Sequence, residues 1–313
     1  MSRSSADFAH EPVMVDEVVA LFAPVPDGAV LDATLGGAGH AAAILDAHPN
    51  LSVIGLDRDP EAVGAATNRL APYGHRARVH HARFDALSEV VASDDAEPLS
   101  GVLFDLGVSS PQLDRGERGF AFRHDGPLDM RMDPTTGRSA SDVVNESSLE
   151  ELTRLLRDGG ETRWAHRIAR AIVASRPITT TGELAELVRN AIPAAARRTG
   201  GHPATRSFQA LRIAVNDELA ILPGAIDDAI AALAPRGRCV VLAYHSGEDR
   251  IVKQRFNHAV TGGCTCPPNL PCGCGAQPKV TLVFRGARKA SVEELTRNHR
   301  AESARLRACE AVA

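Results

Sequence analysis

The sequence is poor in aromatic residues and in lysine, and it has no long apolar segment. Aromatic residues make up 4% of the 313 residues, and Lys253, Lys279 and Lys289 are the only lysines. No unbroken apolar run reaches the ~18 residues that a membrane-spanning helix needs. The first residues, MSRSSADFAHEPV, lack the apolar stretch of a secretory signal. We therefore expect a cytoplasmic protein without a membrane anchor.

The net charge of −4 argues against a chain that binds polyanions over its whole surface, but positive charge is concentrated in one region. From residue 161 to residue 212, nine arginines stand against three glutamates. Such a local basic surface indicates a defined contact with phosphate. The alternative is a set of solvated helix faces in an arginine-rich chain, and both interpretations stay open here. The arginines are Arg163, Arg167, Arg170, Arg176, Arg189, Arg197, Arg198, Arg206 and Arg212.

Four of the six cysteines crowd into the segment CTCPPNLPCGC, as Cys264, Cys266, Cys272 and Cys274. Without a secretory signal, a disulfide framework is not expected. The run has enough thiolates to bind one zinc ion, but its Cys-x-Cys spacing is tighter than the usual Cys-x₂-Cys knuckle. Reduced thiols in an exposed loop are the favoured interpretation, so we expect no bound metal.

Strand-like and helix-like runs alternate in the first third of the chain, which predicts a parallel sheet of the doubly wound kind. Residues 107–138 are rich in glycine, proline and charge, and we interpret them as a long functional loop. Strand character returns at 237–246 and 279–284. The strands predicted in the first third are 29–33, 51–59, 77–84 and 99–107.

Helical spacing dominates from about residue 141 to residue 222. Trp164, Ile168 and Ile172 share one predicted helix face, and a further apolar stripe consists of Phe208, Leu211, Val215, Leu219 and Leu222. Strand-like segments thus occur on both sides of a long helical region, and this order predicts an α/β domain with an inserted helical domain. The predicted boundaries are 1–138 for the first part of the α/β domain, 139–215 for the insertion, and 216–313 for the second part, which contains the Cys-rich loop 264–274.

The segment VLDATLGGAGHAAAIL, residues 30–45, combines a buried strand, a glycine loop and the start of a helix. Residues 37–42 fit the dinucleotide pattern G-x-G-x-x-G/A, and Asp57 stands where an acidic residue takes ribose hydroxyls, so a dehydrogenase is one interpretation. Asp32 favours S-adenosyl-L-methionine (SAM), because a carboxylate there can face the ammonium of a methionine moiety. A dinucleotide has no such amine.

Three aspartates, Asp32, Asp57 and Asp105, each close a predicted strand. Ligands of open α/β sheets bind at this edge of the sheet. Asp105 is followed by a short polar loop, DLGVSSP, at the place where amino-methyltransferases receive the target amine. The alternative is that these aspartates only cap loops.

Several long motifs occur together: HEPVMVDEVV, DATLGGAGH, GLDRDPEA, FDLGVSSPQLDRGERGFAFRHDGPLDMRMD, GHPATRSFQALRIAVNDEL, YHSGEDRIVKQRF and NHRAESARLR. With them the chain closely resembles the bacterial small-subunit rRNA (cytosine-N4)-methyltransferases, the RsmH or MraW family, from about His10 to the C-terminus. It departs from the usual pattern at Ala33, Ala38 and Gly247. None of these departures removes a polar group that the reaction needs.

The resemblance implies a Rossmann-like methyltransferase sheet with an inserted helical substrate domain. It implies transfer of a methyl group from SAM to the exocyclic amine of one cytidine in the decoding region of 16S rRNA. We expect the assembled small ribosomal subunit to be the partner, and a homodimer stays open. The cofactor-binding residues carried over by position are Ala38, Gly39, His40, Asp57, Phe84, Asp105 and Gln112.

Cytosine N4 is a poor nucleophile, so positioning and an acceptor for the amine proton should lower the barrier. Asp105, with the backbone of Leu106 and Gly107, is the first candidate for this catalytic role. His245 is the second, although a histidine at a strand end is more often structural. The loop residues Asp129, Arg131 and Asp133 either organise the base pocket or pair with one another.

Three other functions are compatible with parts of the sequence. They are a methyltransferase acting on an amine of DNA or protein, a dehydrogenase, and an RNA-binding protein without catalysis. The Arg face of the inserted helices, with Arg197, Arg198 and Arg206, would hold phosphates next to an unstacked target base.

Overall fold

The computed structural model describes residues 12–96, 98–198, 201–267 and 273–313. The chain divides into two compact units. The α/β unit consists of Met1–Gly107 and Ile221–Ala313, and the helical unit consists of Val108–Ala220. The predicted fold class, a Rossmann-like α/β sheet interrupted by an all-helical insertion, is confirmed.

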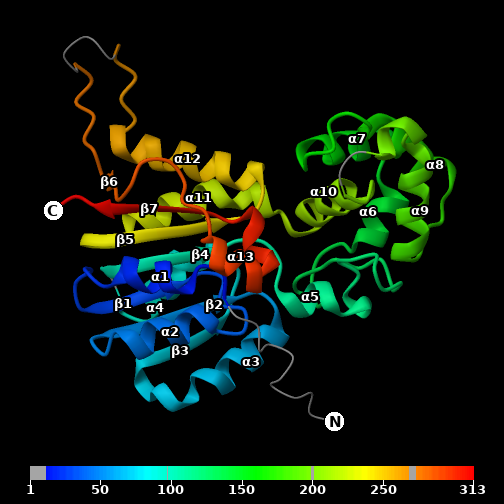
Figure 1. Cartoon of the computed structure of the whole chain (residues 1–313). Helices are drawn as coiled ribbons and strands as arrows, with labels where there is room; N and C mark the ends of the chain where they lie inside the picture. The colour runs from blue at the N-terminus through cyan, green and yellow to red at the C-terminus, as the bar shows by residue number, and fades with distance from the viewer. Residues whose placement is uncertain (1–11, 97, 199–200, 268–272) are drawn as a thin grey trace. The chain divides into compact units, whose positions relative to one another are not determined.

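The α/β unit contains one seven-stranded sheet with the order β3-β2-β1-β4-β5-β7-β6 (Figure 1). Strands β1 to β5 pair in parallel, whereas β7 runs antiparallel to both β5 and β6. The strands are β1 (Gly28–Asp32), β2 (Leu51–Asp57), β3 (Ala77–His81), β4 (Leu99–Asp105), β5 (Leu233–Ala243), β6 (Val280–Leu282) and β7 (Arg305–Ala311).

All six predicted strands overlap observed ones, but β7 was not predicted. Its sequence, RLRACEA, carries charged residues near its ends and in its middle, and these side chains are only partly buried. The predicted strand 77–84 ends early, at His81, since Phe84–Ala86 forms a 3-10 helix.

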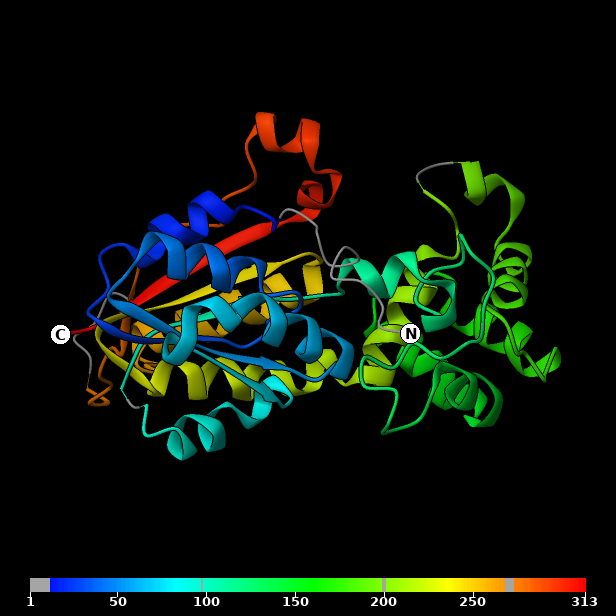
Figure 2. The same cartoon turned by 90° about the horizontal axis from the view of Figure 1, so that it is seen from below.

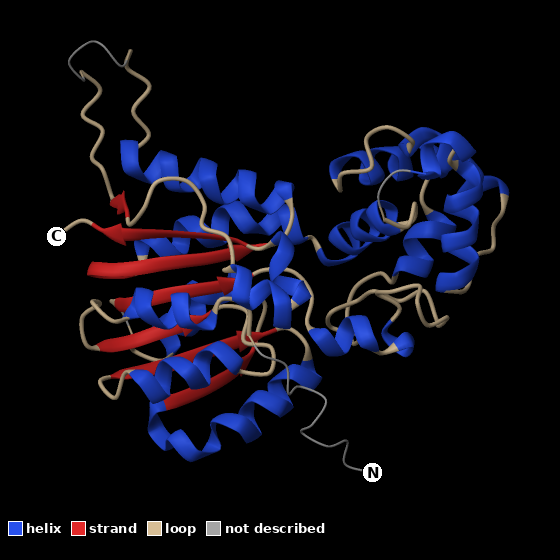
Figure 3. Cartoon of the chain, in the orientation of Figure 1, coloured by secondary structure: helices blue, strands red, loops and turns tan. Residues whose placement is uncertain are grey.

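Helices cover both faces of the sheet (Figures 2 and 3). Along the central strands, successive side chains point to opposite faces. Leu31 and Phe104 pack with α4, α11 and α12, and Val30 and Leu103 pack with α1, α2 and α3. Both faces are therefore apolar, as parallel sheets require. The helices of this unit are α1 (Val15–Phe22), α2 (Gly39–Ala47), α3 (Pro60–Leu70), η2 (Ala71–Arg76), η3 (Phe84–Ala86), α4 (Leu87–Ser93), most of α11 (Glu218–Ala231), α12 (Ser246–Thr261), α13 (Val292–Arg297) and η6 (His299–Ser303).

The helical unit has a core of its own, to which the predicted stripe residues Ile168 and Ile172 contribute. The second predicted stripe is not one helix. Asp217 adopts a left-handed conformation (φ 54°) that ends α10, and Leu222 on α11 packs in the core of the α/β unit. The helices here are α5 (Ser110–Asp114), η4 (Gly116–Arg118), α6 (Ala140–Glu146), α7 (Leu149–Asp158), α8 (Ala165–Ala174), α9 (Thr181–Ala191), η5 (Ala194–Arg198) and α10 (Thr205–Asn216).

The boundaries of the insertion differ from the predicted ones, because residues 108–138 belong to the helical unit rather than to the first domain. Leu128 and Met130 are buried in the helical core. The backbone N–H of Leu128 donates to the carbonyl of Thr179, and that of Ala140 donates to the carbonyl of Asp129. The composition of residues 108–138 predicts a loop, but the side chains of Leu128 and Met130 anchor this segment in the core of the helical unit. Within the described part of the chain, no helix combines the length and apolar character needed to cross a membrane.

A close approach of α1 to the sheet at Gly101 gives a testable stability prediction. A Cβ at Gly101 would lie 2.4 Å from Cε1 of Phe22, whose side chain is 1% exposed. Gly101→Ala should therefore lower the free energy of unfolding by about 1–3 kcal/mol through overpacking. Gly64→Ala, in α3 with nothing within 4 Å of the added Cβ, should raise it by about 0.5–1 kcal/mol. Urea denaturation followed by circular dichroism measures both, and equal effects would contradict the packing argument.

Candidate functional site

Three aspartates lie at the carboxyl ends of adjacent parallel strands. Asp57 ends β2, Asp32 ends β1 and Asp105 ends β4, and the order of these strands in the sheet is β2-β1-β4. The structure thus brings together the side chains that the strand-end pattern predicted to share one edge. This is the edge at which open α/β sheets bind ligands.

The glycine loop crosses from β1 to α2 in front of β2. The N–H of Leu35 donates to the carbonyl of Leu56 at 2.8 Å, and the N–H of Gly36 donates to Oδ2 of Asp57 at 2.7 Å. Ala38, the residue before α2, adopts a left-handed conformation (φ 58°) and is fully buried. This conformation costs a non-glycine residue roughly 1–2 kcal/mol. The loop is therefore held by the sheet in a shape that its sequence does not favour.

The carboxylate of Asp57 fixes two turns at once. Besides Gly36, the N–H of Asp59 donates to its Oδ1 at 2.8 Å. These bonds lower the pKa of Asp57, but burial outweighs them and raises the pKa to about 6. Asp57 therefore holds two turns at the end of β2, and its predicted contact with ribose hydroxyls would use the remaining lone pairs of its two oxygens.

Asp32 is more deeply buried, at 2% exposure, and accepts a 3.2 Å hydrogen bond from the N–H of Thr34. Burial raises the pKa of Asp32 to about 7, and nearby His40 opposes the shift. Asp105 and Asp57 raise it further by repulsion. A cation placed at this edge would stabilise the ionised form of all three aspartates.

Asp105 has the most elaborate surroundings of the three. The hydroxyl of Tyr244 donates to its Oδ1 at 2.6 Å, and its backbone N–H donates to Oγ1 of Thr34 at 2.6 Å. Burial raises the pKa of Asp105 despite the opposing effects of His40 and the Tyr244 hydroxyl. Sequence reasoning missed Tyr244 as a partner. Its position in the sequence could have indicated this contact. Tyr244 directly follows β5, and β5 pairs with β4, the strand that Asp105 ends.

His40 links Asp105 to the segment before α1. Its Nε2 lies 2.9 Å from the carbonyl oxygen of Val13, and because a carbonyl only accepts, Nε2 carries a proton. Its Nδ1 lies 3.5 Å from Oδ2 of Asp105. His40 therefore places one ring nitrogen beside the carboxyl group of Asp105 while the other fastens it to the segment before α1.

His245, the second catalytic candidate, forms the N-cap of α12. Its Nδ1 accepts hydrogen bonds from the N–H groups of Gly247 (3.2 Å) and Glu248 (3.4 Å), and its Nε2 lies 3.1 Å from Oε1 of Glu248. Nδ1 is therefore engaged in the cap, whereas Nε2 is buried next to Glu248 without a hydrogen-bond partner among the described residues.

Two predicted cofactor residues have other neighbours. Phe84 follows β3 and packs edge-to-face on Phe104, with ring centroids 5.9 Å apart, so one part of its ring stays available. Gln112 lies in the helical unit and is buried, with Oε1 accepting a 3.1 Å hydrogen bond from the N–H of Ser109 in a capping box. Gly39 is the first residue of α2, directly after the glycine loop.

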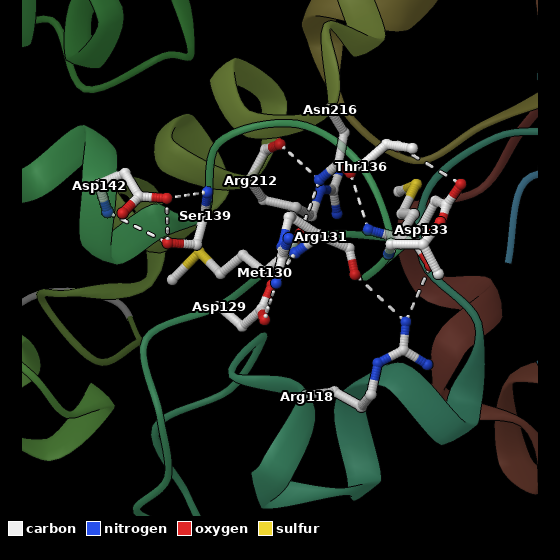
Figure 4. A network of polar contacts seen from close by, with 12 residues as sticks. Arg118, Asp129, Met130, Arg131, Asp133, Thr136, Ser139, Asp142, Arg212 and Asn216 are labelled. Carbon is white, nitrogen blue, oxygen red and sulfur yellow. Dashed lines mark hydrogen bonds and ion pairs between the residues drawn. The ribbon is translucent and has the colours of Figure 1, made fainter.

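In the loop of the helical unit, charged candidates pair with one another (Figure 4). Arg131 donates two 2.8 Å hydrogen bonds to the carboxylate of Asp129, and Asp133 accepts hydrogen bonds from Thr135. Buried Asn216 accepts from the N–H of Met132 at 2.9 Å and fastens this loop to α10. Asp129 and Arg131 thus pair with each other, and a role of these residues at a base pocket stays a prediction.

The arginine-rich region contains both paired and unpaired side chains. Arg167 and Arg170 on α8 and Arg206 on α10 are exposed and form no hydrogen bond or ion pair with the described residues. The side chain of Arg198 lies outside them. The arginines with partners inside the helical unit include Arg176, Arg189, Arg197 and Arg212. Part of the positive charge is therefore structural, and part is available to an anion.

Comparison with known proteins gives one consistent family. A model described as the MraW methylase family matches residues 7–312. The chain is similar to ribosomal RNA small subunit methyltransferase H of Thermobifida fusca (strain YX), with 51% identity covering 98% of this chain and 95% of that protein. The protein of the same name from Mycolicibacterium smegmatis is 52% identical, with 98% and 85% covered. A solved rRNA methylase from Streptococcus thermophilus matches at 12% identity and a TM-score of 0.42, covering 100% and 99%, which is too distant to inform on function.

The buried aspartates predict an unusual dependence of stability on pH. Because the folded-state pKa of Asp32 is about 7 and its ordinary value is 3.8, the folded chain keeps a proton that the unfolded chain has lost. The free energy of unfolding should therefore fall as pH rises from about 4 to about 7, by roughly 1–4 kcal/mol from this group. Asp32→Asn should flatten the dependence, whereas Asp16→Asn, at an exposed position of α1, should leave it unchanged. Urea denaturation at a series of pH values measures this, and parallel curves for wild type and Asp32→Asn would refute it.

Proposed function

The chain belongs to the MraW methylase family, and from this premise we propose that it methylates the N4 amine of one cytidine in the decoding region of 16S rRNA. Membership makes the protein a SAM-dependent methyltransferase of small-subunit rRNA. The target atom, the nucleotide and a preference for the assembled subunit are the proposal. The observation that carries it is the partly buried carboxyl group of Asp105, held at a strand end beside Tyr244 and His40.

The edge of the sheet suits SAM by charge. SAM bears a cationic ammonium and a cationic sulfonium, and three aspartates with raised pKa values lie where positive charge would stabilise their ionised forms. SAM supplies an electrophilic methyl group on sulfur. The residues proposed to hold it are Ala38, Gly39, His40, Asp57, Phe84, Asp105 and Gln112.

Asp105 is proposed as the group that receives the amine proton. The cytosine N4 lone pair is delocalised into the ring, so the amine must become pyramidal before its nitrogen can bond to the methyl carbon. A carboxylate that accepts one N–H favours this form and takes the proton as the new C–N bond completes. A raised pKa makes Asp105 a stronger acceptor than an ordinary aspartate, and the Tyr244 hydroxyl orients it.

His245 enters the proposal as a positioning residue. It caps α12 directly after Tyr244, whose backbone N–H donates to Oε2 of Glu248 at 2.8 Å. The cap therefore fixes the backbone from which the Tyr244 hydroxyl reaches Asp105. This keeps His245 in the site without assigning it a proton transfer.

The function is tested by incubating the protein with methyl-labelled SAM and small subunits from cells that lack this gene, followed by digestion of the rRNA to nucleosides. The expected product is N4-methylated cytidine. Asp105→Asn, which keeps an acceptor for Tyr244, should lower the single-turnover rate measured at saturating SAM by roughly 10²-fold or more. Label in a different nucleoside would overturn the assigned target atom. Native turnover by Asp105→Asn would remove Asp105 as proton acceptor.

The unpaired arginines give a second expected outcome. Replacing Arg167, Arg170 and Arg206 together by alanine should weaken binding to small subunits and reduce its salt dependence by about one unit of slope for each phosphate that these side chains neutralise. SAM affinity should not change. Arg189→Ala is the matched control, because this exposed arginine is paired with Glu186. Filter binding at several salt concentrations measures the effect, and an equally weakened binding by Arg189→Ala would contradict a specific phosphate contact.

A further inference from the structure

The cysteines of the protein fall into two sets with different surroundings. Cys239 on β5 and Cys309 on β7 face each other across paired strands and are fully buried. The others belong to the segment between α12 and β6, which leaves the sheet as two extended arms (Figure 1). Within the described parts of that segment, Cys264, Cys266 and Cys274 are partly or fully exposed to solvent. Cys239 and Cys309 therefore serve as small buried side chains of the sheet core. Packing of this kind does not account for the exposed cysteines of the second set.

The three sulfur atoms of the second set converge. The Sγ atoms of Cys264, Cys266 and Cys274 all lie within 4.8 Å of one another, and those of Cys264 and Cys274 are 3.6 Å apart. Zn–S bonds of about 2.3 Å at tetrahedral angles place two sulfurs about 3.8 Å apart. A disulfide needs about 2.05 Å. The 3.6 Å contact is that of an S–H···S hydrogen bond between thiols, not of a covalent bond, and it is close to the separation of two thiolates on one ion.

Backbone contacts hold the two arms together at their base. The N–H of Cys264 donates to the carbonyl of Thr261 at 3.1 Å, and the N–H of Lys279 donates to the carbonyl of Ala259 at 2.9 Å. Gly262 adopts φ 61°, and a Cβ there would lie 2.2 Å from the carbonyl oxygen of Gln277. Both arms are thus anchored on the last turn of α12. The thiols approach one another through this arrangement, although ten residues separate Cys264 from Cys274.

The arms have no apolar core to keep them in place. The described residues of 264–267 and 273–279 include no large apolar side chain. Conformational entropy opposes such an arrangement, because fixing a backbone residue costs about 1–2 kcal/mol. Small segments of this kind are usually held by a cross-link, and metal–thiolate bonds supply folding free energy directly.

We propose that Cys264, Cys266 and Cys274 form a structural site for a divalent transition-metal ion that favours thiolate ligands, with Zn²⁺ as the natural occupant. Methyl transfer from SAM needs no metal, so the ion braces the protruding segment and takes no part in the reaction. This proposal departs from the expectation of free thiols. Three thiolates leave one position of a tetrahedral ion for a further ligand. Cys272 belongs to the same sequence run and lies outside the described residues, so its contribution is a separate question.

Metal analysis of the full-length protein tests the site. Protein purified without chelator should contain about one zinc per chain by mass spectrometry. Cys264→Ser, Cys266→Ser and Cys274→Ser should each lose it, while Cys239→Ala, which removes a thiol from the sheet core, should retain it. Circular dichroism checks that each variant is folded. Cys272→Ser then shows whether a fourth thiolate completes the coordination.

Reconstitution keeps the test decisive if a variant proves unstable. Wild-type protein stripped by chelator should bind Co²⁺ with the intense visible and near-ultraviolet absorption of tetrahedral thiolate coordination, and added Zn²⁺ should abolish it. The site is overturned if stripped protein binds neither ion tightly. It is also overturned if non-reducing mass spectrometry finds a disulfide among these cysteines in freshly purified protein. Neither result affects the rRNA assignment, which is read from methylated nucleosides.

Discussion

The partial or complete burial of three carboxyl groups at one sheet edge is the constraint on which the site depends. Carboxylates withdrawn from water lose hydration, and Asp57 and Asp105 repel the fully buried Asp32 besides. The structure compensates with backbone N–H groups of the glycine loop, with the hydroxyl of Tyr244 and with His40. Without a cation nearby, burial favours the protonated form of these carboxyl groups. A cationic cofactor would favour their ionised form instead, so the burial that costs stability also creates affinity for positive charge.

Much of the fold follows from the alternation of apolar strands and amphipathic helices. Strands such as β1 and β4 are buried on both faces and read as continuous apolar runs, which sequence inspection detects. Strand β7 escaped detection because Arg305, Arg307 and Glu310 interrupt its apolar pattern. Two of these side chains bond to distant partners: Arg307 donates to Asp249 on α12 at 2.7 Å, and Glu310 accepts from Arg238 on β5 at 2.9 Å. Pairing of that kind is a tertiary property, and local pattern does not reveal it.

The site was predictable to the extent that it depends on strand ends. The three aspartates were found because parallel strands bring their carboxyl ends to one edge. The links of Asp105 to His40 and Tyr244 were not, since they join segments far apart in the sequence. Nor could spacing distinguish His245 as a helix cap from a base. The glycine pattern of residues 37–42, which also fits a dinucleotide site, belongs here to a methyltransferase. The fingerprint describes a loop shape that several cofactors share.

The position of β7 between β5 and β6 has a consequence for synthesis on the ribosome. Strand β7 follows β5 and β6 in the chain but lies between them in the sheet, and β6 pairs with nothing but β7 in the ladder of described strands. Strands β1 to β4 can pair as they emerge, but β4 and β5 are separated by the whole helical unit. Domains generally fold as they leave the exit tunnel, and contacts distant in sequence form slowly. The helical unit can therefore fold before β5 joins β4, whereas the seven-stranded sheet is complete only once β7 has been synthesised and has paired with β5 and β6.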